Sequence, residues 1–167
     1  YPYYDASTRG LDFPGMIAAL ESLAPGSIVV LHACCHNPTG VDPTPAQWTR
    51  IIDVVRARGL VPILDLAYQG FGEGIDADAY AVRALASAGA SFFVANSFSK
   101  SMSVYGERAG ALSVVCPDAQ QAEHVLGQMK FVIRRIYSSP AIHGGQIVAH
   151  VLADADHVHR RVEQRAR

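Results

Sequence analysis

The chain has 167 residues, of which 50% are hydrophobic and 17% are charged, and its mean hydropathy is +0.14. This composition predicts one packed globular domain and excludes an intrinsically disordered chain, which would be poor in apolar residues. The net charge of −1 argues against nucleic acid as a partner, and no apolar run reaches the roughly 18 residues of a membrane span.

Short, nearly continuous apolar runs alternate with amphipathic segments along the chain. The pattern predicts strands at residues 27–35, 60–68, 91–99 and 110–116. It predicts helices at residues 12–23, 45–58 and 78–88, and a long one at 118–135. Such apolar runs are typical of strands that are buried on both faces of a parallel sheet. The sequence therefore predicts an α/β fold with a mostly parallel sheet.

The segment 45–58 has the clearest helix signals. Thr44 is the expected N-cap, Pro45 takes the first helical position, Gln47 completes a capping box and Gly59 ends the helix. One apolar stripe follows at helical spacing: Trp48, Ile51, Ile52 and Val55. The helix at 118–135 has an apolar face of its own, made of Val125, Leu126, Met129, Val132 and Ile133.

The three cysteines do not have the spacing of a disulfide framework, and their odd number favours a reducing cytoplasm. Cys34 and Cys35 lie between His32 and His36, a set of residue types that is found in metal sites. Strand alternation places Cys35 on the opposite face from the other three side chains. Structural zinc sites also draw on two separated ligand pairs, and no second pair is present. We therefore predict no metal site.

Polar segments follow three of the apolar runs. These endings are HNPTG at 36–40, DLAYQG at 65–70 and SFSK at 97–100. Because ligands bind at the carboxyl ends of the strands in open α/β sheets, the three segments are the candidate site.

Three charged side chains at or near these ends allow both a functional and a structural interpretation. Lys100 is one of only two lysines among 14 basic residues. If its amine is withdrawn from water, it can serve Schiff-base chemistry; the structural alternative is a lysine that extends its amine into solvent. Asp65 is either a ligand-binding carboxylate or a buried cap, since a carboxylate in apolar surroundings needs a partner. Arg108 either binds a phosphate together with Ser97 or pairs with Glu107.

Other motifs are absent or uninformative. The glycine run GFGEG at 70–74 departs from the dinucleotide-binding pattern G-x-G-x-x-G, and the sequence has neither a P-loop nor a G-x-S-x-G motif. The basic stretch at 160–167 is interpreted as the solvated face of a helix.

As an ordered set, the segments HNPTG, DLAYQGF, SFSKSMSVYGERAGAL and IRRIYSSPAIHGG closely resemble the aspartate and aromatic amino-acid aminotransferases. These are class I enzymes of fold type I that depend on pyridoxal 5′-phosphate (PLP). The resemblance covers the whole chain, and its S-x-S-K…E-R-x-G element is highly specific for a PLP lysine. It implies a three-layer α/β large domain with a mostly parallel sheet.

The resemblance implies catalytic roles for three residues. Lys100 would form the Schiff base with PLP and shuttle the proton at the substrate α-carbon. Asp65 would pair with the pyridine nitrogen and keep it protonated, which makes the ring an electron sink. Tyr68 would hydrogen-bond the phenolic oxygen of the cofactor.

Further matching residues would bind the cofactor and the substrate. Asn37 would contact the phenolic oxygen and the substrate, and Ser97 and Arg108 would bind the phosphate. Arg134 matches the arginine that reaches across the interface of a homodimer to the distal carboxylate of a dicarboxylic substrate. Arg135 is its neighbour and the alternative match.

Members of this family run to roughly twice the length of a typical single domain. The resemblance therefore implies that residues 1–167 are a partial PLP-binding large domain, with about 147–167 starting the helix toward an absent small domain. A glycine-rich phosphate loop, an aromatic residue that stacks on the cofactor and the arginine for the substrate α-carboxylate would all lie elsewhere. We therefore expect little or no activity from this chain alone.

The resemblance thus implies part of a cytoplasmic, homodimeric PLP-dependent aminotransferase. The enzyme would move an amino group between aspartate or an aromatic amino acid and a 2-oxo acid such as 2-oxoglutarate. Two alternatives stay open: a PLP-fold domain that binds or regulates without turnover, and another PLP reaction type such as a lyase. The intact Lys100 disfavours the first, and Arg134 disfavours the second.

Overall fold

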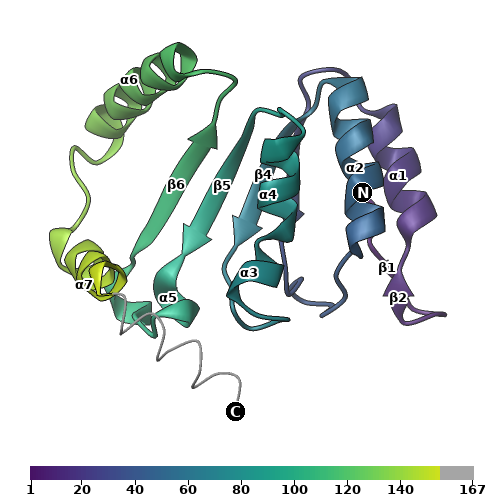
Figure 1. The fold of residues 1–167 in the computed structure, drawn as a ribbon, viewed down its shortest axis with the longest axis horizontal. Coiled ribbons are helices and arrows are strands. Elements are labelled where there is room, and N and C mark those ends of the chain that lie inside the picture. Colours follow the sequence, from purple (N-terminus) through teal and green to yellow (C-terminus); the bar gives the residue numbers. More distant parts are fainter. Residues whose placement is uncertain (155–167) are drawn as a thin grey trace.

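The computed structural model describes residues 1–154, and Figure 1 shows their fold. The strands are β1 (Tyr4–Asp5), β2 (Gly10–Leu11), β3 (Ile28–His32), β4 (Val61–Leu66), β5 (Phe92–Ser97) and β6 (Gly110–Val115). The helices are α1 (Phe13–Ser22), α2 (Pro45–Arg58), α3 (Ile75–Asp78), α4 (Tyr80–Ser87), α5 (Phe98–Ser101), the 3-10 turn η1 (Tyr105–Glu107), α6 (Ala119–Ile136) and α7 (Ile142–Ala153).

The central sheet has the strand order β3-β4-β5-β6, and β1 and β2 form a separate small hairpin. Strands β3, β4 and β5 are parallel, whereas β6 is antiparallel to β5. The parallel strands are joined through helices, as parallel neighbours require. After β5 the chain passes through α5 and η1 and returns from the same end of the sheet, which makes β6 antiparallel. The α/β class with a mostly parallel sheet is confirmed.

Helices α1, α2 and α4 pack on one face of this sheet (Figure 1). Val29 and Leu31 of β3 are buried on this side, while Ile28 and Val30 point to the other side and are 67% and 53% exposed. Strands β3, β4 and β5 lie in the sheet in the same order as in the chain. Because connections between parallel strands are right-handed, the helices that join such strands all lie on the same face of the sheet. The expectation of strands buried on both faces is therefore wrong for residues 1–154. We call the side with Ile28 and Val30 the uncovered face.

Helix α2 agrees with its prediction at both ends and on its buried side. The backbone N–H of Gln47 donates to the Thr44 hydroxyl, and the backbone N–H of Thr44 donates to the Gln47 side chain, which forms the capping box. Gly59 ends the helix in the left-handed region, with φ of 61°. The predicted stripe lies in the core, at exposures of 5% or less: Trp48, Ile51, Ile52 and Val55.

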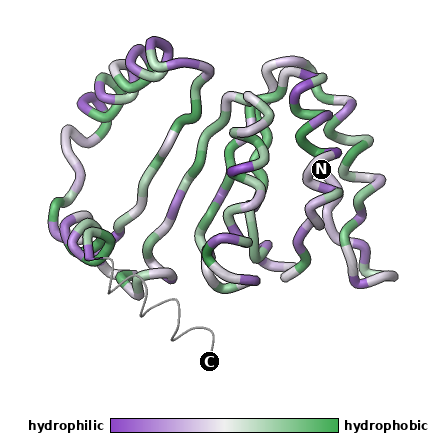
Figure 2. Tube along the Cα trace, viewed as in Figure 1, coloured by the Kyte–Doolittle hydropathy of each residue, from purple (hydrophilic) through white to green (hydrophobic). Residues whose placement is uncertain are grey.

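Two other predicted helices differ from the observed ones. The helix expected at 78–88 begins later, as α4 at Tyr80, and Asp78 instead ends the preceding short helix α3, with its carboxylate turned back to the loop before it. Helix α6 is capped by the Asp118 side chain, which accepts a hydrogen bond from the backbone N–H of Gln121, but none of its residues is buried. Apolar and polar residues alternate along it in Figure 2. Its predicted apolar face therefore lacks a covering element within the described part of the chain.

The C-terminal expectations are only partly covered by the structure. Helix α7 begins at Ile142, before the helix expected at about 147–167. The basic stretch at 160–167 lies outside the described residues. Among the helices that are described, none has the length and apolar character needed to cross a bilayer.

Candidate functional site

The three predicted segments meet at one end of the sheet, where the parallel strands have their carboxyl ends; we call this end the Lys100 edge. His32 near the end of β3 is in register with Asp65 of β4, and Asp65 is in register with Ala95 of β5. Strand β5 then ends at Ser97, and α5 follows with Lys100. The parallel arrangement of β3, β4 and β5 thus gathers these strand ends, as the sequence predicts.

Lys100 and Tyr68 are in contact. The Lys100 Nζ lies 4.8 Å from the centre of the Tyr68 ring, which is within the range of a cation–π interaction. The ring of Phe71 meets the Tyr68 ring edge-on, with the two centroids 6.2 Å apart. Both Lys100 and Tyr68 are partly buried. Lys100 is therefore held against an aromatic side chain, which favours the functional interpretation over that of a freely solvated lysine.

Asp65 lies on the uncovered face of the sheet. Its neighbours Leu64 and Leu66 are buried on the helix-covered side, so strand alternation places the Asp65 side chain on the opposite side. The register of β3 and β4 puts His32 beside it on the same face. A carboxylate and an imidazole therefore occupy neighbouring positions on the side of the sheet where Ile28 and Val30 are exposed.

Ser97 joins β5 to α5. Its hydroxyl accepts a hydrogen bond from the backbone N–H of Ser99 at 3.4 Å and so caps the short helix that carries Lys100. The backbone N–H of Phe98 donates to the carbonyl of Ala109 at 3.1 Å. This bond ties the start of α5 to the segment that contains Arg108.

Arg108 follows η1 in the left-handed region, with φ of 51°. Its side chain is exposed, and the guanidinium donates to the carbonyl of Tyr105 at 3.0 Å. Glu107 instead contacts His143, with an oxygen 2.7 Å from the ring Nδ1. The alternative pairing of Arg108 with Glu107 is therefore not the one observed.

Asn37 lies just after β3, in a turn whose His36 ring stacks on Tyr3 of the N-terminal segment. Its backbone N–H donates to the Nδ1 of His32 at 3.5 Å, and its peptide bond to Pro38 is cis. The His36 ring lies parallel to the Tyr3 ring, with centroids 3.6 Å apart, and 4.6 Å from the His32 ring. Burial, and then the nearby His32, lower the pKa of His36. The turn therefore favours a neutral imidazole at His36.

The two adjacent cysteines are arranged differently from the prediction. Strand β3 ends at His32, and Cys35 has φ of 49°, so strand alternation does not extend to Cys34 and Cys35. Their sulfur atoms and a carboxylate oxygen of Asp78 lie within 4.8 Å of one another. Burial, followed by nearby negative groups, raises the pKa of both thiols, which disfavours the thiolate that a metal needs. The cluster therefore favours protonated thiols.

Arg134 is not gathered with the other predicted site residues. It is exposed in the last turn of α6, and its guanidinium donates to the hydroxyl of Ser138. In Figure 1 α6 lies beyond β6, away from the edge where α5 follows β5. Within the described chain, α6, which carries Arg134, thus lies apart from α5, which carries Lys100.

Sequence reasoning missed two residues near the site. His32 was weighed only as a metal ligand, although aligning the ends of the two predicted strands would have placed it beside Asp65. Asp78 was expected only as the first residue of a helix, but its buried carboxylate binds backbone N–H groups of the preceding loop. No sequence pattern marks that role, because the partners of Asp78 are backbone atoms.

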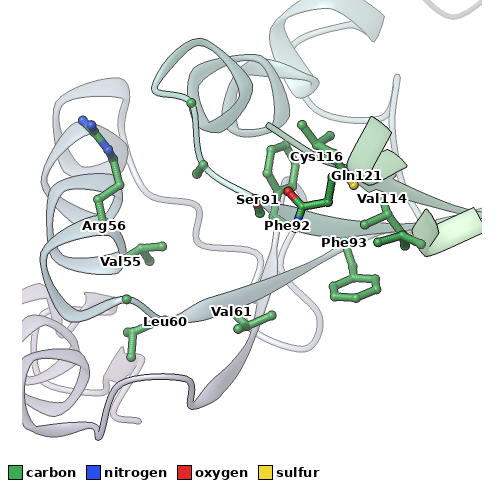
Figure 3. A pocket seen from close by; sticks show the side chains of 15 residues that line it. Val55, Arg56, Leu60, Val61, Ser91, Phe92, Phe93, Val114, Cys116 and Gln121 are labelled. Carbon is green, nitrogen blue, oxygen red and sulfur yellow. The ribbon is translucent and has the colours of Figure 1, made fainter. Parts of the chain in front are cut away.

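A separate pocket of about 470 Å³ lies at the opposite end of the sheet (Figure 3). Apolar residues at the starts of β4 and β5 and at the end of β6 line most of it, among them Val61, Phe92 and Val114. Arg56 and Cys116 are its titratable residues. This pocket is thus apolar and lies away from the edge that holds Lys100.

Comparison with known proteins agrees with the arrangement of the strand ends. The whole chain, residues 1–167, matches the family model described as aminotransferase class I and II. It is 57% identical over 155 residues to the tyrosine aminotransferase of Klebsiella pneumoniae and 55% identical over 152 residues to the aspartate aminotransferase of Pseudomonas aeruginosa. These matches cover 93% and 91% of this chain but 39% and 38% of the two relatives. The chain spans about two fifths of the length of these relatives.

Solved structures give the same result. The aromatic-amino-acid aminotransferase of Burkholderia pseudomallei, covalently bound to pyridoxal phosphate, matches with a TM-score of 0.96 and 58% identity. The match covers 99% of this chain and 41% of that one. A psychrophilic aromatic amino acid aminotransferase from Psychrobacter, cocrystallised with aspartic acid, also has a TM-score of 0.96, at 51% identity. The resemblance in the strand-end segments is therefore confirmed, and the chain belongs to the class I and II aminotransferase family.

Proposed function

We propose that this chain carries the cofactor lysine and adjoining cofactor-binding residues of a PLP-dependent aminotransferase. The observation that carries the proposal is the contact between the Lys100 amine and the Tyr68 ring, at the edge where Asp65 and Ser97 lie near the ends of adjacent strands. The reaction would move an amino group between aspartate or an aromatic amino acid and a 2-oxo acid such as 2-oxoglutarate. The names of the tyrosine, aromatic and aspartate aminotransferase relatives support this substrate class.

The side chains at this edge match the functional groups of PLP. The cofactor has an aldehyde, a pyridine nitrogen, a phenolic oxygen and a phosphate. The edge offers an amine, a carboxylate, a phenolic hydroxyl and a guanidinium, from Lys100, Asp65, Tyr68 and Arg108. When it is bound, PLP supplies an electron sink for negative charge at the substrate α-carbon. The set of donors and acceptors therefore fits this cofactor.

Three residues would take part in the chemistry. Asp65 would hold a proton at the pyridine nitrogen through a charge-assisted hydrogen bond, which keeps the ring electron-poor. Tyr68 would donate its hydroxyl proton to the phenolic oxygen in a hydrogen bond. Lys100 would hold the cofactor through its amine and carry a proton to and from the substrate α-carbon.

Three further residues would bind and orient. Asn37, in the turn after β3, would direct its side-chain amide to the phenolic oxygen and the substrate. Arg108 would exchange its bond to the Tyr105 carbonyl for a phosphate oxygen, where its planar guanidinium can form two parallel hydrogen bonds. The Ser97 hydroxyl would bind the same phosphate.

Arg134 would recognise the distal carboxylate of a dicarboxylic substrate in the site of a second subunit. Its side chain is exposed, and the helix that carries it, α6, lies apart from α5 of its own chain, which carries Lys100. This is the placement expected of a residue that completes a neighbouring site in a homodimer. We accordingly propose a homodimer with substrate bound at the subunit interface.

We also propose that the protein works in the cytoplasm. Cys34, Cys35 and Cys116 are all free thiols, and free thiols are typical of proteins in a reducing compartment.

Two lysine variants test the proposed function, in the protein expressed from its full reading frame. Lys100→Ala should remove the visible absorption of covalently held cofactor and lower the transamination rate by about 10³-fold or more, because both the covalent link and the proton carrier are lost. Lys130→Ala is the matched control: this lysine is exposed on α6 and should be dispensable for both properties.

The same assays separate the alternatives. A Lys100→Ala protein that kept its absorption and its transamination would refute the assignment. If the unmodified protein held PLP without any turnover, a regulatory or binding domain would be favoured. Release of ammonia without an amino-group acceptor would instead favour a lyase.

A further inference from the structure

Asp78 is a buried carboxylate that the proposed chemistry does not use. The residue is only 5% exposed, and it accepts three hydrogen bonds from backbone N–H groups. Its Oδ2 accepts from Gly70 at 2.7 Å and from Gly72 at 3.0 Å, and its Oδ1 accepts from Glu73 at 2.9 Å. A buried charge is stable only when such partners are present. Asp78 therefore holds the loop between β4 and α3 at three residues within a stretch of four.

The loop is shaped to receive this carboxylate. A Cβ atom at Gly72 would come within 2.6 Å of the Asp78 Oδ1, so a glycine is needed there for the close approach. Gly70 and Gly74 have φ of 91° and 116°, a region that other residues rarely adopt. The GFGEG run that matched no phosphate-binding motif therefore allows the backbone to wrap around Asp78.

The anchored loop is directly connected to Tyr68. Phe71 lies between the two anchored residues Gly70 and Gly72, and its backbone N–H donates to the Tyr68 carbonyl at 3.0 Å. The Phe71 ring meets the Tyr68 ring edge-on at an interplanar angle of 85°. The Tyr68 ring also contacts the Lys100 amine, 4.8 Å from the ring centre. Contacts thus run from the Asp78 carboxylate through the loop to the Tyr68 ring and on to Lys100.

We propose that Asp78 is a positioning residue that holds the Tyr68 side chain against Lys100 by anchoring the loop of residues 70–73. This inference rests on the proposed function, since the hydroxyl of Tyr68 matters only if it binds the phenolic oxygen of the cofactor. A loop that is no longer anchored would let Phe71 and Tyr68 shift together. The hydrogen bond from Tyr68 to the cofactor would then be weakened, although Tyr68 itself is unchanged.

Asp78→Asn is the direct test, made in the protein expressed from its full reading frame. An amide nitrogen cannot accept a hydrogen bond, so at least one of the three N–H groups loses its partner in either amide orientation. Asp76→Asn is the matched control, because Asp76 is an exposed carboxylate two residues away that pairs with Arg83. Both variants remove one negative charge, and only Asp78→Asn removes the anchor.

Two measurements then report on the loop and on Tyr68. In the cofactor-free protein, amide hydrogen exchange over residues 70–73 should be about tenfold faster in Asp78→Asn than in Asp76→Asn. In the protein loaded with PLP, the pH midpoint of the cofactor's visible absorption should rise by about one unit. The rise is expected because a weaker hydrogen bond from Tyr68 leaves more charge on the phenolic oxygen to retain the nearby proton.

A second variant covers the case in which Asp78→Asn does not fold. Gly72→Ala keeps the carboxylate but places a Cβ against it, and it should shift the same midpoint in the same direction. Gly127→Ala is its control, since a Cβ at that position meets nothing within 4 Å.

The possible results separate this inference from the proposed function. Faster exchange with an unchanged pH midpoint in Asp78→Asn and Gly72→Ala would mean that the carboxylate only stabilises the loop, and would overturn the inference alone. Unchanged exchange would overturn it as well. An unmodified protein without any visible cofactor absorption would overturn the proposed function, and this inference with it.

Discussion

His36 links the turn after β3 to the N-terminal segment and makes stability depend on pH. Its Nδ1 lies 2.8 Å from the hydroxyl of Thr39, and its ring stacks on Tyr3. Burial and then His32 lower its pKa from the ordinary value of 6.5, although the Asp42 carboxylate acts in the opposite direction. The folded protein therefore binds this proton less readily than the unfolded chain does.

We predict that the free energy of unfolding falls as the pH drops through about 6.5, because the unfolded state then takes up a proton that the folded state resists. His36→Gln cannot take up that proton, so its stability should fall less steeply over this range. Chemical denaturation on both sides of pH 6.5 measures the slope. The control is His124→Gln, which replaces an exposed histidine on α6. A slope in His36→Gln as steep as in the unmodified protein would contradict the prediction.

The residues of the candidate site were predictable to different degrees. Lys100 and Tyr68 follow apolar strands and Asp65 lies near the end of one, so the rule that ligands bind at the carboxyl ends of strands predicted all three as site residues from the sequence alone. Asp78 was beyond reach because its three partners are backbone groups of a loop whose path depends on tertiary packing. The prediction that strand alternation places Cys35 on the opposite face from Cys34 was wrong for a similar reason, because β3 already ends at His32.

At the scale of the elements, α2 shows how much a local cap contributes. The Thr44 hydroxyl accepts the N–H of Gln47 at 3.3 Å, and the Gln47 side chain accepts the N–H of Thr44 at 2.8 Å. Thr44→Ala should lower the free energy of unfolding by about 1 kcal/mol, because a backbone donor at the helix start loses its partner. Denaturant titration of the protein measures this change.

The control for the cap is Thr49→Ala in the same helix. The Thr49 hydroxyl donates to the carbonyl of Pro45 at 3.1 Å, but it satisfies no free N–H at the helix start. Its removal should change stability by less than about 0.5 kcal/mol, as is usual for surface positions. Equal losses from the two threonine variants would show that the cap is not the source of the effect.

The helices also show which features of an element a sequence can reveal. The cap, end and buried side of α2 were all predictable, because they depend on residues within the helix and on a core that the same chain supplies. The apolar face of α6 was predictable as a pattern, but its burial was not. Phe131 and Ile136 of α6 stay 58% and 71% exposed within residues 1–154, although the Arg135 guanidinium lies 5.3 Å from the centre of the Phe131 ring. Burial depends on neighbouring elements that a local pattern does not describe.

At the scale of the whole fold, the main feature of residues 1–154 is a sheet with helices packed on one side. On the uncovered face Ile28 and Val30 of β3 are largely exposed, and so is Leu112 of β6, at 54%. Strands β3 and β6 are also the two edges of the four-stranded sheet within the described residues. Exposed apolar surface and unpaired strand edges both promote association with other polypeptides. The Asp65 carboxylate lies on this same face, so whatever covers the face also encloses the candidate site.

We predict that the 167-residue chain expressed alone self-associates, binds an apolar fluorescent dye and shows little or no transamination. Association should follow from the exposed side chains of Ile28 and Val30, and replacing both with threonine should weaken it, because threonine keeps the β-branched shape but removes apolar surface. Activity should be missing because the uncovered face, on which Asp65 lies, is open to water, whereas catalysis of this kind needs a site from which water is excluded. Light scattering, dye fluorescence and a transamination assay measure the three properties, with the product of the full reading frame as the control. A monomeric chain with measurable transamination would show that residues 1–167 enclose the site by themselves.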